Sequence, residues 1–149
     1  MSEPTPTPIT GTCLCRSLKL IIPSGITPIK TLLCHCVDCQ KNSGAPFQSN
    51  AMFNTSDLII EDPQGLLKTY KIEEGTASGK PKEKGWCGKC GCPLYTKPGH
   101  YEGRMMVVKT GFLDGGADHF PPQIEIFTAD RAKFLAPAEG VKQFERMPH

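Results

Sequence analysis

The sequence predicts an all-β domain with little helix, and two observations favour this class. Glycine and proline are frequent, with 15 and 14 copies in 149 residues, which is typical of chains with many turns between short strands. The apolar residues occur in short runs that such turns separate. These runs predict seven or eight short strands within one compact domain.

The first half of the chain contains most of the expected strands. Four segments predict them: 18–22, 29–33, 46–54 and 58–72, the last with a turn at 62–65. Between the second and third of these, residues 37–43 predict one or two helical turns, which Gly44 closes as a C-terminal cap.

The second half begins with a polar, glycine-rich segment at 73–85, which predicts an exposed loop. The stretch "WCGKCGCPLYTK" (86–97) predicts a metal-binding turn that runs into a strand. Two further strands are predicted within "GRMMVVKTGFL" (103–113) and "PPQIEIFTAD" (121–130).

Neither a repeat nor a break in composition divides the chain. The start, "MSEPTPTPIT", has little to bury, so residues 1–10 predict a disordered tail. We therefore expect a single domain at 11–136, followed by a C-terminal tail at 137–149.

Composition and charge exclude several classes of protein. The formal net charge of +2 is small and dispersed, which does not favour nucleic-acid binding. No run reaches the ~18 apolar residues that cross a membrane, and the N-terminus does not resemble a secretory signal. A cytoplasmic protein is the expectation, and the sequence predicts no particular oligomeric state.

The eight cysteines occur in three groups, which points to metal rather than to disulfides in a reducing compartment. The groups are Cys13 and Cys15 in "CLC"; Cys34, Cys36 and Cys39 in "CHCVDC"; and Cys87, Cys90 and Cys92 in "CGKCGC". Zinc prefers four thiolate or imidazole ligands in a tetrahedron.

Counting ligands divides these cysteines between two zinc ions. Cys13, Cys15, Cys87 and Cys90 make one closed four-sulfur site, whereas Cys34, Cys36 and Cys39 leave a fourth position open, as a catalytic zinc requires. Cys92 is either the fourth ligand of the second site, which would then be closed, or a buried free thiol.

Other side chains have both a functional and a structural interpretation. His35 is either a general acid–base or a histidine bonded to a carbonyl or lying on the surface. The amides of Ser43, Gly44 and Ala45 either face the second zinc or form a capping turn. Three lysines either bind substrate carboxylates or lie in a solvated loop: Lys82, Lys84 and Lys89.

These motifs resemble the glutathione-dependent formaldehyde-activating enzymes, a zinc family with a β-tent fold that includes centromere protein V. The resemblance rests on "GTCLC", "CHCVDCQKNSGAPF", "WCGKCGCPLY" and "PPQIEIF", in this order. It implies a structural zinc on Cys13, Cys15, Cys87 and Cys90, and a catalytic zinc on Cys34, Cys36 and Cys39.

The resemblance also implies an activity. The namesake reaction joins glutathione and formaldehyde into S-(hydroxymethyl)glutathione, formally a carbon–sulfur lyase reaction run in reverse. One alternative is a zinc-dependent lyase or isomerase that acts on another thiol conjugate or small metabolite. A second is a non-catalytic zinc module that binds a partner, for which two closed zinc sites would be the signature.

Overall fold

The fold consists mainly of two β-sheets, which confirms the all-β, β-tent class. The computed structural model describes residue 3 and residues 6–148. The smaller sheet has three antiparallel strands in the order β1 (Ile9–Thr12), β2 (Lys19–Ile22) and β5 (Ile59–Glu61).

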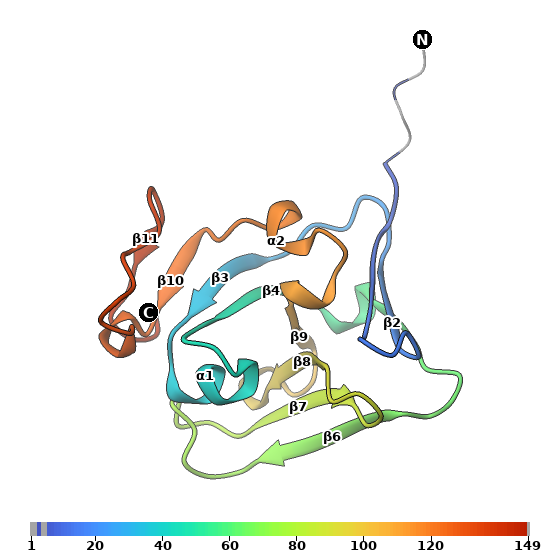
Figure 1. The fold of residues 1–149 in the computed structure, drawn as a ribbon, viewed down its shortest axis with the longest axis horizontal. Helices are drawn as coiled ribbons and strands as arrows, with labels where there is room; N and C mark the ends of the chain where they lie inside the picture. The colour runs from blue at the N-terminus through green and yellow to red at the C-terminus, as the bar shows by residue number, and fades with distance from the viewer. Residues whose placement is uncertain (1–2, 4–5, 149) are drawn as a thin grey trace.

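The larger sheet has eight strands and curls strongly, as Figure 1 shows. Their order across the sheet is β11 (Lys142–Gln143), β10 (Ile124–Ile126), β3 (Lys30–Cys34), β4 (Gln48–Asn54), β9 (Met105–Lys109), β8 (Pro93–Pro98), β7 (Lys82–Cys87) and β6 (Leu67–Ile72). The pairs are antiparallel except that β10 is parallel to both β3 and β11.

Helices are short and lie at the ends of strands. The α-helices are α1 (Val37–Ser43) and α2 (Gly116–His119), and the 3-10 turns are η1 (Thr55–Asp57), η2 (Gly99–Tyr101), η3 (Thr110–Phe112) and η4 (Thr128–Asp130). Gly44 ends α1 with φ of 65°, as the sequence predicts, and its amide donates to the Gln40 carbonyl.

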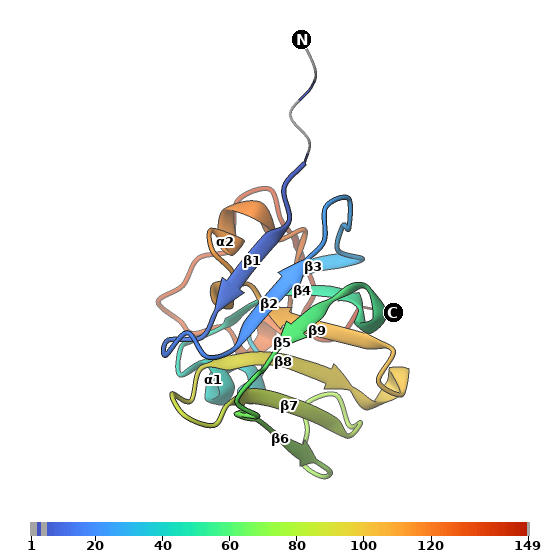
Figure 2. The ribbon, with the colours of Figure 1, turned by 90° about the vertical axis from the view of Figure 1, so that its right-hand side faces the viewer.

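The outer face of the large sheet carries the main core. Figure 2 shows the small sheet in front of this face, crossing β4, β8 and β9. Because side chains alternate along a strand, one set of positions points outward and is apolar. These residues pack with Leu20 and Ile22 of the small sheet: Ala51, Phe53, Tyr95, Met106 and Val108. The alternate positions point into the hollow of the large sheet.

The expected loop at 73–85 is corrected at its C-terminal end, where Lys82–Cys87 form β7. Lys82 and Lys84 belong to this strand, whose inner face borders a cavity where charged side chains are solvated. Gly85 suits this strand because a Cβ there would lie 2.5 Å from the Tyr95 ring. The eleven strands of the described residues also exceed the seven or eight expected, since strands as short as two residues give little signal in the sequence.

The domain boundaries stay a prediction. The expected disorder of residues 1–10 falls partly on residues 1–2 and 4–5, which lie outside the described residues. Strand β1 begins at Ile9, within that segment, and β11 lies within 137–149. The latter segment also bonds to the domain, because the Ala138 amide donates to Glu125 Oε2 at 2.8 Å.

Candidate functional site

Two groups of cysteine side chains gather in space, and they are the groups that ligand counting formed. In each group the sulfur atoms lie within 4.8 Å of one another: Cys13, Cys15, Cys87 and Cys90 in one, and Cys34, Cys36 and Cys39 in the other. We call them the four-cysteine cluster and the three-cysteine cluster. The eight cysteines are free of disulfides.

The four-cysteine cluster joins the end of β1 to the end of β7. The Sγ of Cys15 lies 3.4 Å from that of Cys13 and 3.6 Å from that of Cys87. Four sulfurs at ~2.3 Å from a zinc ion would be about 3.8 Å apart in a tetrahedron. The donor set and its spacing therefore fit Zn²⁺, with no ligand position left over.

Tight turns place these sulfurs. Arg16 adopts φ of 65° and its amide donates to the Cys13 carbonyl at 2.9 Å. Gly91, with φ of 76°, makes the matching contact to the Cys87 carbonyl at 2.8 Å. The Leu18 amide also donates to Cys13 Sγ at 3.4 Å, a bond that stabilises a thiolate.

The three-cysteine cluster forms where β3 runs into α1. Cys34 is the last residue of β3, Cys36 is the N-cap of α1, and Cys39 lies in its first turn. The Cys39 amide donates to Cys36 Sγ at 3.4 Å, which is the capping bond of the helix. One sharp strand-to-helix junction thus brings three sulfurs to one point.

The cluster favours a negatively charged sulfur. Hydrogen bonds from the thiols of Cys34 and Cys39, helped by the Cys39 amide and the charge of Lys82, lower the pKa of Cys36 to about 2. The pKa of Cys34 is raised, because its thiol donates to Cys36 and because it is buried. Three converging sulfur atoms, one of which is favoured as a thiolate, fit a metal cation.

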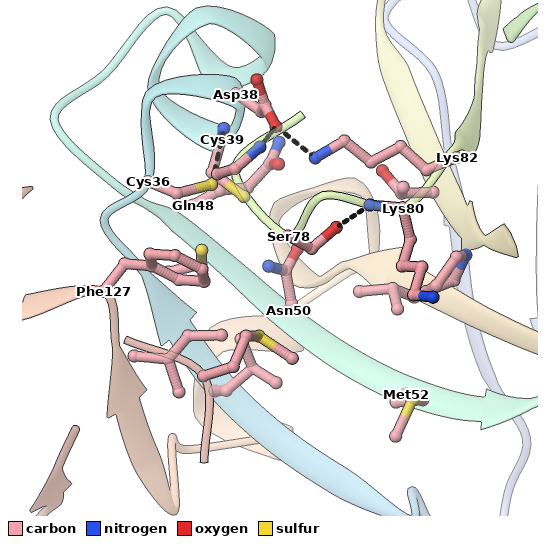
Figure 3. Close-up of a pocket in the computed structure, with 18 of the residues that line it drawn as sticks. Cys36, Asp38, Cys39, Gln48, Asn50, Met52, Ser78, Lys80, Lys82 and Phe127 are labelled. Atoms are coloured by element: carbon pink, nitrogen blue, oxygen red, sulfur yellow. Dashed lines mark hydrogen bonds and ion pairs between the residues drawn. The ribbon is translucent and has the colours of Figure 1, made fainter. Parts of the chain in front are cut away.

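The two clusters differ in their surroundings. The three-cysteine cluster borders a cavity of about 420 Å³ on the inner face of the large sheet, whereas no member of the four-cysteine cluster lines it. Figure 3 shows Cys36 and Cys39 at one end of this space, with Asn50 and Met52 farther along it. A ligand in the cavity can therefore reach only the three-cysteine cluster.

The cavity has lysines on several of its sides and one apolar wall. Five lysines line it, with Asp38 as the acidic residue among the described lining: Lys30, Lys80, Lys82, Lys84 and Lys109. Near Cys34, the lining from β3 and β10 is apolar: Leu32, Ile124 and Ile126. Such a space suits a small anion that also has apolar surface.

Asp38 connects the three-cysteine cluster to the segment at 73–81. Its Oδ2 accepts hydrogen bonds from Lys82 Nζ at 2.6 Å and from the Ala77 amide at 2.8 Å. Ala77, Ser78 and Lys80 form part of the cavity wall. Figure 3 shows Ser78 and Lys80 across from Asp38 and Cys39 of α1. The segment is thereby held against the helix that carries Cys39.

His35 faces away from the cavity and is 2% exposed. Its Nε2 lies 2.8 Å from Glu125 Oε1. His35 is therefore a buried partner of a carboxylate, whereas the structural interpretation expected a bond to a carbonyl or a place on the surface. Burial opposes ionisation of Glu125. Hydrogen bonds from Gln143, His35 and the Ala138 amide, with the charge of Arg131, outweigh burial and lower the pKa of Glu125 to about 2.

The remaining candidates are the three lysines and the amides of the turn at 43–45. Lys82 and Lys84 line the cavity, and Lys89 does not. The Ala45 amide is bonded to Ser43 Oγ at 3.1 Å, which is the capping interpretation of that turn.

Cys92 lies outside both clusters and packs against the core that contains Cys13 and Cys87. Sequence reasoning missed two buried charged residues, Lys109 and Glu125. Their only signal was a charge at an otherwise apolar strand position.

Fold and site together define a β-tent protein with a four-cysteine cluster and with a three-cysteine cluster that borders a cavity. The family model described as "Glutathione-dependent formaldehyde-activating enzyme" matches residues 8–130. The chain belongs to this family, as the sequence motifs indicated.

A search of curated proteins found no match. Among solved structures, the chain resembles a Rhodobacter sphaeroides protein from structural genomics at 15% identity, with a TM-score of 0.52. That match covers 91% of this chain and 98% of the other, and it supports the fold alone. No helix among the described residues has the length and apolar character needed to span a membrane.

Proposed function

We propose that this protein catalyses the reversible addition of the glutathione thiol to formaldehyde, which forms S-(hydroxymethyl)glutathione. The observation that carries the proposal is the position of the three-cysteine cluster at the end of a cavity with five lysines. Glutathione has two carboxylates and a thiol, so its charge suits the lysines while its sulfur lies near the cluster.

We propose two zinc ions per chain. Cys13, Cys15, Cys87 and Cys90 would hold a structural ion, and Cys34, Cys36 and Cys39 would hold the second. A zinc ion with an open position favours the thiolate form of a thiol that binds there. The chain's own part is to bind the anionic peptide with lysines such as Lys30 and Lys84, and to limit water with the segment at 73–81.

The test combines zinc content with turnover. Wild-type protein should contain two zinc ions per chain and accelerate formation of the adduct above the spontaneous rate. Cys34→Ser should lose one zinc and at least ~100-fold in rate, since a ligand is removed. S-methylglutathione, which has no free thiol, should give no reaction.

Cys92→Ser is the matched control, because Cys92 is a cysteine outside both clusters. It should keep two zinc ions and full activity. Loss of a zinc ion in this variant would make Cys92 a ligand and close a site that the proposal needs open. Full activity in Cys34→Ser would also overturn the proposal.

The apolar wall favours one alternative, a lyase or isomerase that acts on a larger thiol conjugate. Leu32, Ile124 and Ile126 offer more apolar surface than a one-carbon aldehyde can cover. A higher kcat/KM for glutathione with hexanal than with formaldehyde would support this alternative.

A non-catalytic zinc module is less favoured by the geometry, because a closed second site needs a fourth protein ligand and Cys92 lies elsewhere.

The free thiols and the proposed substrates suit a cytoplasmic protein.

A further inference from the structure

Asn50 and Lys109 are polar residues on the inner face of the large sheet, two strand positions from the pair of Cys34 with Gln48. Register places Cys34 opposite Gln48, and Asn50 opposite Leu32 on one side and Lys109 on the other. Two positions along a strand correspond to ~7 Å. Asn50 and Lys109 line the same cavity as the cysteines, so their donors and the sulfur atoms face one space.

The hydrogen bond between these residues leaves donors free. Lys109 Nζ donates to Asn50 Oδ1 at 3.0 Å. An amide that accepts through its oxygen keeps its NH₂ group as a donor, and an ammonium has three donors. In the described part of the chain, Asn50 makes no other side-chain hydrogen bond, and no carboxylate oxygen lies within 4.0 Å of Lys109 Nζ.

A buried ammonium without a carboxylate is costly unless it serves a negative ligand. Lys109 is 5% exposed and Asn50 is 3% exposed. Burial lowers the pKa of Lys109 to about 8, although negative charge on Cys39 and Cys34 raises it. The Nζ of Lys109 therefore offers hydrogen-bond donors beside the place where a thiol would react.

We propose that Lys109 and Asn50 form a two-donor site for the carbonyl oxygen of the aldehyde; this inference rests on the proposed function. The thiolate sulfur bonds to the carbonyl carbon, and the π electrons of the C=O bond move to oxygen. Lys109 Nζ and Asn50 Nδ2 donate to this oxygen as it becomes negative. The oxygen then takes a proton from water, and the hydroxide combines with the proton that the thiol released.

The test compares Lys109→Met with Lys19→Met. Methionine keeps the length of lysine without its charge or donors, and Lys19 lies on β2 in the other sheet. Removal of an oxyanion donor lowers kcat by ~100- to 1000-fold. Lys109→Met should therefore lose kcat by this factor, with KM for glutathione within about threefold of wild type, and Lys19→Met should match wild type.

Zinc content separates this role from a structural one. If Lys109 only balances the charge of the cysteine cluster, Lys109→Met will lose zinc in parallel with its activity, and the inference is overturned. Unchanged kcat in a variant with two zinc ions also overturns it. Asn50→Asp, which keeps the acceptor for Lys109 but removes the NH₂ donors, should lower kcat at least ~10-fold if both donors act.

A second measurement does not depend on turnover. Formate is an unreactive oxyanion of the right size, and its binding can be followed by the ¹³Cε resonance of Lys109 in zinc-loaded wild type. A saturable shift that Asn50→Asp abolishes supports the two-donor site even if glutathione and formaldehyde fail as substrates. Absence of any shift overturns the site, whereas absence of wild-type turnover overturns only the proposed function.

Discussion

At the residue scale, Glu125 shows how one buried carboxylate holds two parts of the chain together. Its Oε1 contacts His35, which lies between Cys34 and Cys36 of the three-cysteine cluster. Its Oε2 accepts from the Ala138 amide at 2.8 Å and from Gln143 at 2.5 Å. The C-terminal segment and the β3–α1 junction therefore share one charged group, which is 1% exposed.

Glu125→Gln should destabilise the protein by about 3 kcal/mol at pH 7, because the ion pair between Glu125 and Arg131 is lost. The pKa of Glu125 is lowered from 4.5 to about 2, so its ionised form stabilises the fold above pH 4.5. That contribution is lost as the pH falls toward 2, and the difference between wild type and variant should shrink over this range. Urea unfolding at several pH values measures it.

Glu61→Gln is the control for this prediction, because Glu61 is an exposed carboxylate on β5. It should change stability little at any pH. A difference for Glu125→Gln that stays constant from pH 7 to pH 3 would contradict the role of its charge.

At the element scale, Asp38 bonds the segment at 73–81 to helix α1. Asp38 accepts from the Ala77 amide and from Lys82, and both bonds end at one oxygen atom. Asp38→Asn removes the charge, and hydrogen bonds to charged groups contribute about 1.5–3 kcal/mol. We expect thermolysin to cleave this segment at least ~10-fold faster in the variant. Asp57→Asn, in η1, should leave the rate of cleavage unchanged. Equal rates in all three proteins would show that the bonds of Asp38 do not hold the segment.

A second element-scale prediction concerns the contact of β1 with η3. A Cβ on Gly11 would lie 2.2 Å from the Phe112 carbonyl oxygen, so backbone atoms would have to move. Gly11→Ala should destabilise the protein by at least about 1–3 kcal/mol, as overpacking does. Gly111→Ala is a matched control in η3, the turn that contains Phe112, since no atom lies within 4 Å of its added Cβ. Equal unfolding midpoints for the two variants would contradict the prediction, since they would mean that β1 shifts to accommodate the added Cβ at little cost.

At the scale of the whole molecule, the four-cysteine cluster connects the two sheets. Cys13 and Cys15 follow β1 of the small sheet, whereas Cys87 ends β7 of the large sheet and Cys90 lies in the turn after it. A structural zinc contributes ~10–16 kcal/mol of apparent binding free energy, which is comparable to the ~5–15 kcal/mol stability of a domain. The three-cysteine cluster lies within one strand–helix junction and joins no second sheet.

Zinc removal should therefore occur in two stages. A mild chelator should take the ion of the three-cysteine cluster first, through the cavity, with loss of activity and little change in circular dichroism. Removal of the second ion should unfold the protein. Cys15→Ser should abolish the second stage and lower Tm strongly, and unfolding together with release of the first ion would contradict this order.

The sequence by itself determined the β class, the capped helix at 37–43 and the grouping of the cysteines, because these follow from turns, short-range periodicity and ligand spacing. Only the tertiary structure decided which cluster borders the cavity. It also decided that Lys109 stands beside Asn50 and that Glu125 meets His35. These partners lie 59 and 90 residues apart, so strand register, which local sequence does not specify, brings them together.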